Sequence, residues 1–186
     1  MFRKIASDSH LLFRLLLVLC FVIFAAAVRI LPHSWNFTPV GAMALFSGAK
    51  LGRSWKAFVF PLAALFFGDL FVGFHSLMPV VYFSFCLSVL IGIAFRHRQS
   101  FKPLAAATFL GSLQFFLITN FGFWALTDFY PHTAAGLAAC YIAGISYFGN
   151  TLAGDACYVL LFFGGFALLD RPSPQPRASE PQPSNL

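Results

Sequence analysis

Charged side chains are scarce in this sequence. Asp, Glu, Lys and Arg make up only 10% of its 186 residues, whereas an ordinary soluble domain carries about 25%. Hydrophobic residues make up 59% of the chain, and 26 residues are Phe. Because so few charges cannot cover a surface that faces water, the composition predicts an integral membrane protein whose partner is the lipid bilayer. The net charge of +6 therefore does not indicate a nucleic-acid partner.

The sequence also lacks the common motifs of metal sites and catalytic sites. Its four cysteines stand singly in apolar runs, so neither a disulfide framework nor a metal site is predicted, and we expect them to pack as small apolar residues. They are Cys20, Cys86, Cys140 and Cys157. HExxH, GxSxG, paired Asp-rich metal motifs and the P-loop pattern GxxxxGK[ST] are missing. We therefore expect no enzyme activity and no cofactor, and the chain cannot hydrolyse ATP itself.

Long apolar runs predict an all-α membrane protein with about six transmembrane helices in one domain, residues 11–169. A spanning helix needs about 20 mainly apolar residues. The predicted spans are residues 11–31, 38–49, 55–74, 77–95, 103–126 and 150–169. The apolar stretch 134–169 is too long for one simple span, so we assign residues 135–148 to a separate outer-surface or re-entrant helix. Residues 1–10 are predicted to be a cytoplasmic N-terminus, and the Pro- and Ser-rich residues 170–186 a disordered cytoplasmic tail.

Lysine and arginine alternate between the predicted loops. They occur before the first span, between spans two and three, between spans four and five, and after span six, and the other loops contain none. Because cytoplasmic loops carry the excess of Lys and Arg, both termini are predicted to be cytoplasmic. The charged start followed by Ala25, Ala26 and Ala27 also resembles a cleavable signal peptide. Arg14 interrupts that apolar core, so we favour an uncleaved first span.

Polar groups inside the predicted spans gather at one depth. In the predicted orientation, Asp69, Asn120, Thr151 and Asp155 lie in the outer parts of their spans, and Arg29 ends the first span on the outer side. A charged group inside a span costs on the order of 3 kcal/mol and usually has a function or a partner. We therefore predict that Asp69, Asp155 and Arg29 line an outward-facing cavity for a small polar solute. An ion pair with Arg29, and simple helix bridging by the Asn and Thr, stay open as alternatives.

The short second span predicts a further feature of this cavity. We expect Thr38 to be its N-cap and Pro39 to occupy its first helical position. At about 1.5 Å per residue the span is shorter than the ~30 Å hydrocarbon core, and its many small residues require enclosure by other helices. A positive helix N-terminus in the cavity would favour an anionic or carbonyl-bearing ligand. A simple packing helix is the alternative.

Five segments of the sequence resemble one family. They are RILPHSWNFTPVGAMALFSGA, GDLFVGFH, NFGFW, YPHTAAGLAACY and FGNTLAGDACY. Over about residues 29–164 they resemble the DUF6580 family, small bacterial membrane proteins of unknown function described as transport proteins. That family is similar to the substrate-binding S components of energy-coupling-factor (ECF) vitamin transporters.

The resemblance implies a multi-pass protein of the bacterial inner membrane that binds a solute such as a vitamin or vitamin precursor. A membrane coupling subunit and ATPase subunits would energise uptake. The resemblance assigns these matching positions to the cavity: Asn36, Thr38, Asp69, His75, Asn120, Trp124, Asn150 and Asp155. S components commonly dock their coupling subunit through an Ala-x-x-x-Ala face on the first helix. This sequence has three contiguous alanines there, and its nearest small-xxx-small pair is Ala44 and Gly48 in the second span.

Two other functions stay open on the sequence. A stand-alone proton-coupled carrier could use Asp69 and Asp155 as its proton-carrying pair. A membrane enzyme acting on a lipid at the outer face could assemble carboxylates and histidines through its fold, although the missing motifs count against it.

Overall fold

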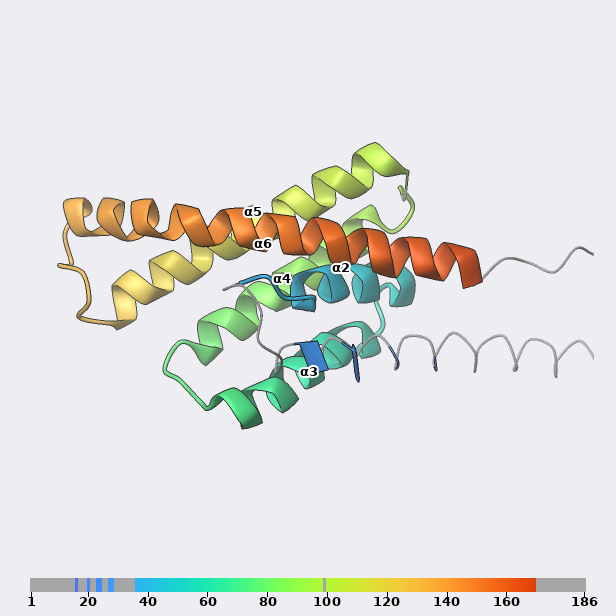
Figure 1. Ribbon diagram of the computed structural model, residues 1–186, viewed down its shortest axis with the longest axis horizontal. Coiled ribbons are helices and arrows are strands. Elements are labelled where there is room, and N and C mark those ends of the chain that lie inside the picture. The colour runs from blue at the N-terminus through green and yellow to red at the C-terminus, as the bar shows by residue number, and fades with distance from the viewer. Residues whose placement is uncertain are drawn as a thin grey trace, which may run out of the picture.

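The computed structural model describes residues 36–98 and 100–169, together with six earlier positions: Leu16, Cys20, Ile23, Phe24, Ala27 and Val28. In the two continuous ranges every regular element is a helix, so the predicted all-α class is confirmed for them. The helices are α2 (Val40–Leu51), α3 (Lys56–Val72), α4 (Met78–Phe95), α5 (Phe101–Leu126) and α6 (Ala134–Leu169) (Figure 1). Most of the predicted first span, the signal-peptide alternative, Arg29, residues 1–10 and the tail lie outside the described residues.

The last apolar stretch forms one helix and not two. α6 runs unbroken through 36 residues, so the predicted division into an outer helix and a sixth span is wrong. Thr133 caps its start, because its hydroxyl accepts a 3.1 Å hydrogen bond from the N–H of Gly136. The stretch contains no Pro, and beside the predicted break the hydroxyl of Thr151 donates to the carbonyl of Tyr147 one turn earlier, at 3.0 Å. At about 1.5 Å per residue α6 is about 54 Å long, so it must tilt or extend beyond a ~30 Å hydrocarbon core.

Three described helices, α4, α5 and α6, are long and apolar enough to cross a membrane. α3 has 17 residues and α2 has 12, which correspond to about 26 Å and about 18 Å. The described residues therefore support a helical membrane protein but do not support six spans. α3 exposes large apolar side chains, among them Phe66, Phe67 and Phe71, as expected of a surface that faces lipid.

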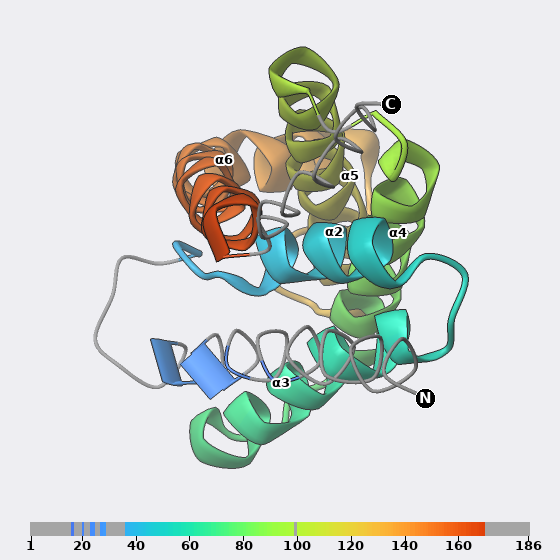
Figure 2. The same ribbon diagram turned by 90° about the vertical axis from the view of Figure 1, so that its right-hand side faces the viewer.

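α2 lies in the middle of the bundle, between α3 on one side and α5 and α6 on the other (Figure 2). Eight of its 12 residues are buried, so its predicted enclosure is confirmed. It approaches α4 closely: a Cβ on Gly48 would collide with the carbonyl of Val89, and a Cβ on Gly92 would collide with the carbonyl of Leu45. Ala44 is also fully buried. This small-residue pair of α2 therefore packs within the chain and is not exposed to a partner.

The described basic residues lie at one end of the bundle. In Figure 1, the turns at 52–55 and 96–98 and the end of α6 lie toward the right, and the turns at 73–77 and 127–133 lie toward the left. The described Lys and Arg residues belong to the right-hand end: Lys50, Arg53, Lys56, Arg96, Arg98 and Lys102. The predicted orientation rests on this distribution, and the left-hand end is called the outer end below.

Candidate functional site

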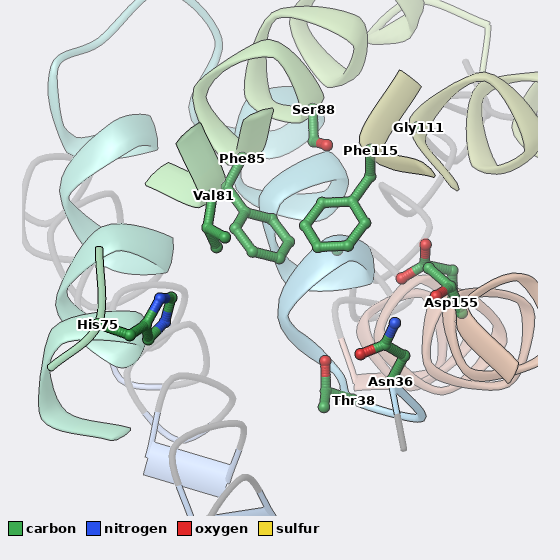
Figure 3. A pocket seen from close by; sticks show the side chains of 11 residues that line it. Asn36, Thr38, His75, Val81, Phe85, Ser88, Gly111, Phe115 and Asp155 are labelled. Atoms are coloured by element: carbon green, nitrogen blue, oxygen red, sulfur yellow. The ribbon is translucent and has the colours of Figure 1, made fainter. Parts of the chain in front are cut away.

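A cavity of about 200 Å³, here called the inner cavity, lies beside the N-terminus of α2. Four helices and the segments before α2 and α4 line it, with these residues: Asn36, Thr38, Gly41, His75, Val81, Phe85, Ser88, Gly111, Phe115, Thr151 and Asp155. Figure 3 shows the rings of Phe85 and Phe115 on one side of the space and Thr38 on the opposite side, with His75 and Asp155 at its two ends in this view. The structure thus brings together five predicted site residues: Asn36, Thr38, His75, Thr151 and Asp155.

The inner cavity continues into a wider space of about 690 Å³, here called the vestibule. Asn36, His75, Val81 and Phe115 line both spaces, so a solute in the vestibule contacts the rim of the inner cavity. The vestibule is also lined by Leu77, Thr119, Asn120, Phe123, Phe129, Tyr130, Cys140, Ala143, Gly144 and Tyr147. Several of these belong to the turns at the outer end, so the vestibule connects the inner cavity with that end.

Asp155 supplies the carboxylate of the inner cavity and is only 4% exposed. Ser112 Oγ on α5 donates a 2.7 Å hydrogen bond to Asp155 Oδ2, and the backbone N–H of Ala42 in the first turn of α2 also hydrogen-bonds to this carboxylate. The first N–H groups of a helix have no partner within the helix, so Asp155 caps α2 from a different helix. Gly41 permits the approach, because a Cβ there would collide with Asp155 Oδ1.

This contact corrects the prediction of Thr38 as N-cap and bears on the predicted ligand. The N-cap residue of α2 is Pro39, which makes no side-chain capping bond, and the helix begins at Val40. Asp155 provides the acceptor that Thr38 was expected to provide, so the helix needs no cap from its own segment. The positive N-terminus assigned to an anionic ligand is already matched by the chain's own carboxylate. An anion placed there would be repelled by Asp155.

Two groups beside the inner cavity were not among the predicted site residues. The rings of Phe85 and Phe115, with centroids 5.0 Å apart, form its apolar side. Gln114 on α5 joins two serines of α4: Ser84 Oγ donates to Gln114 Oε1 at 3.0 Å, and Gln114 Nε2 donates to Ser88 Oγ at 2.9 Å. The sequence contains a sign of this network, because Ser84 and Ser88 are one turn apart in one predicted span and Gln114 is an amide inside the next.

Asp69 does not join Asp155. It is 1% exposed, and Tyr82 on α4 donates a 2.8 Å hydrogen bond to Asp69 Oδ2. Asp69 lines neither the inner cavity nor the vestibule. The structure thus places one carboxylate at the cavity and the other between α3 and α4, and Arg29, the third member of the predicted group, lies outside the described residues.

The other predicted residues do not line the inner cavity. Asn120 lines the vestibule, and its Nδ2 donates to the carbonyl of Phe116 at 2.8 Å. Trp124 lines neither space, and its indole N–H donates to the carbonyl of Pro131, in the turn between α5 and α6, at 2.9 Å. Asn150 is half-buried on α6 and also lines neither space.

The described residues therefore define a helical protein with three helices long and apolar enough to cross a membrane, and with a polar cavity that opens through a vestibule toward one end. Residues 9–177 match the family DUF6580, whose description is a family of unknown function. Since this match covers most of the chain, the protein belongs to that family. Comparison with curated proteins and with solved structures found no match. Within residues 36–98 and 100–169, no group of three or more His, Cys, Asp or Glu side chains is placed to hold a metal ion.

Proposed function

We propose that this protein binds a small solute in the inner cavity, taken from the outer side of the membrane, and serves as the solute-specificity subunit for its uptake. The observation that carries the proposal is the inner cavity itself. Its lining combines a carboxylate, an amide, hydroxyl groups and a histidine with two Phe rings. Small-molecule sites combine aromatic surface with placed polar groups that fix the orientation of the ligand.

The volumes bound the size of the solute. One water molecule occupies about 30 Å³ in the liquid, so the inner cavity of about 200 Å³ corresponds to roughly seven waters. A molecule of vitamin size would fill the inner cavity and extend into the vestibule of about 690 Å³. The residues that line both spaces would then contact the middle of the solute.

Uptake against a gradient needs an energy source. The sequence contains no P-loop, so we propose that a membrane coupling subunit with ATPase subunits drives transport, as in the ECF transporters that the sequence resembles. The placement of the carboxylates supports this over a proton-carrying pair. Asp69 is hydrogen-bonded to Tyr82 and lines neither space, so it does not face Asp155 across the cavity.

Native mass spectrometry of the full chain, extracted in mild detergent from its own host's membranes, tests this proposal. We expect a retained small molecule together with coupling and ATPase subunits. Thr151→Phe would fill the inner cavity from α6 and should abolish retention of the small molecule, whereas Ala153→Phe, on an exposed position of the same helix, should not. A wild-type protein that carries no solute, or equal retention by the two variants, would contradict the proposal.

A further inference from the structure

We propose that the inner cavity selects an organic cation, a solute whose protonated amine lies at Asp155. This inference rests on the proposed function and names the chemical class of its solute. It follows from the charge, the free hydrogen-bonding positions and the aromatic surface of the described lining.

The charge of the lining favours a cation. Among the described residues, Asp155 is the one Asp, Glu, Lys or Arg that lines either the inner cavity or the vestibule. Its carboxylate points into the space between Phe115 and Asn36, and His75 lies at the far side of that space (Figure 3). A solute that enters from the vestibule therefore meets one carboxyl group and no Lys or Arg of the described lining.

Among the described residues, Ser112 and Ala42 donate to the Asp155 carboxylate, and further acceptor positions remain. An ionised carboxylate offers about four lone-pair positions, and Ser112 and Ala42 occupy two of them. The carboxylate is only 4% exposed, and a buried charge is costly unless an opposite charge pairs with it. A protonated amine in the inner cavity would supply that charge together with N–H donors for the remaining positions.

The dipole of α2 does not reverse this preference. A helix N-terminus carries the equivalent of about half a positive charge, which offsets only part of the full negative charge of a carboxylate. With Asp155 ionised, the net charge at this end of the cavity is therefore negative. The N–H of Ala42, in the first turn of α2, uses one acceptor position of Asp155. The positions that Ala42 and Ser112 do not use are available to the solute.

The aromatic wall suits the same class of solute. Phe85 and Phe115 lie within the lining with ring centroids 5.0 Å apart. Ring faces attract a cation within about 6 Å of the centroid and also pack against an apolar body. Val81 extends this apolar side toward the vestibule. The expected solute thus combines a protonated amine with a flat or apolar body.

Three probes of matched shape test the inference with the full chain in lipid nanodiscs: 2-phenylethylamine, 2-phenylethanol and 3-phenylpropionate. At neutral pH they carry a positive charge, no charge and a negative charge. We expect the amine to bind at least about tenfold more tightly than the alcohol, and the carboxylate to bind most weakly. Asp155→Asn keeps an oxygen for Ser112 and Ala42 but should reduce amine binding to the level of the alcohol. Asp128→Asn removes the same charge from an exposed turn at the outer end and should preserve the preference.

The wild-type order alone can overturn the inference, so it does not depend on the variant folding. Equal binding of amine and alcohol, preference for the carboxylate, or no binding of the amine contradicts it, and so does an amine preference that survives in Asp155→Asn. The proposed function is judged separately. It stands if native membranes yield a solute that Thr151→Phe excludes, even a neutral or anionic one, and it fails if no solute is retained.

Discussion

Ser112 on α5 donates a 2.7 Å hydrogen bond to Asp155 on α6, and the same carboxylate accepts the N–H of Ala42 on α2. Three helices therefore meet at one buried carboxylate that also lines the inner cavity. The contact has two consequences. It fixes the N-terminus of α2 against its neighbours, and it holds the carboxylate in one place for a solute.

The first prediction concerns the stabilising part of this contact. Ser112→Ala removes a donor from a buried carboxylate and should lower the free energy of unfolding by about 0.5–2 kcal/mol, since hydrogen bonds between membrane helices average ~0.6 kcal/mol and bonds to charged groups are stronger. Unfolding titrations of the purified protein would measure it. A double-mutant cycle with Asp155→Ala, which removes the acceptor, should show coupling, because the two residues share one bond. Strictly additive effects would mean that the bond contributes nothing to stability.

The second prediction separates the two buried carboxylates. Tyr82→Phe removes the hydroxyl that donates to Asp69 Oδ2 at 2.8 Å, so it should lower the free energy of unfolding by about 1–3 kcal/mol. Solute occupancy measured by native mass spectrometry should stay unchanged in Tyr82→Phe and in Asp69→Asn, because Asp69 lines neither space. A folded Asp69→Asn protein that has lost its solute would show that Asp69 is part of the binding site.

The helices were largely predictable from the sequence. The ranges predicted for α2 to α5 agree with the structure within two residues at each end, because apolar length, turn residues and Lys or Arg in the loops determine these boundaries. α6 was predicted wrongly because the apolar stretch 134–169 was divided to match the thickness of a bilayer. The continuity of a helix depends on its backbone, and nothing in this stretch prevents the backbone from continuing.

The sequence did not show which of the predicted site residues share one cavity. Asp69 and Asp155 lie at similar predicted depths, and apolar periodicity does not show which way each one faces. Rotation of a helix about its axis is fixed by close contacts such as those of Gly48 and Gly92 with the facing backbone. In the structure Asp155 lies at the cavity and Asp69 lies against Tyr82. Which residues packing brings together can be found only from coordinates or from an alignment of related sequences.

The third prediction tests the packing of α2 on α4. Gly48→Ala and Gly92→Ala each place a Cβ against the backbone of the facing helix, so each should lower the free energy of unfolding by about 1–3 kcal/mol. Gly149→Ala and Gly164→Ala are matched controls within α6, since a Cβ at either position meets nothing within 4 Å. They should be neutral or stabilising by up to about 1 kcal/mol, because Ala favours a helix over Gly. Equal effects at all four glycines would show that helix propensity and not close packing is measured.

The last prediction tests the side of the membrane from which the inner cavity is reached. Ser76 and Asp128 lie in the turns of the outer end, and Ser54 and Ser100 lie at the end that holds the described Lys and Arg. Each is changed to Cys in a variant without native cysteines, and intact cells are treated with a membrane-impermeant maleimide.

Ser76→Cys and Asp128→Cys should be labelled in intact cells, whereas Ser54→Cys and Ser100→Cys should be labelled only after permeabilisation, because Lys and Arg stay on the cytoplasmic side. Permeabilised cells control for burial of each thiol. Since the vestibule opens among the turns that contain Ser76 and Asp128, this result would place its mouth outside the cell, as binding for uptake requires. The reverse labelling would show that the mouth of the vestibule faces the cytoplasm. The same carboxylate and aromatic wall would then bind a solute for export or a cytoplasmic ligand.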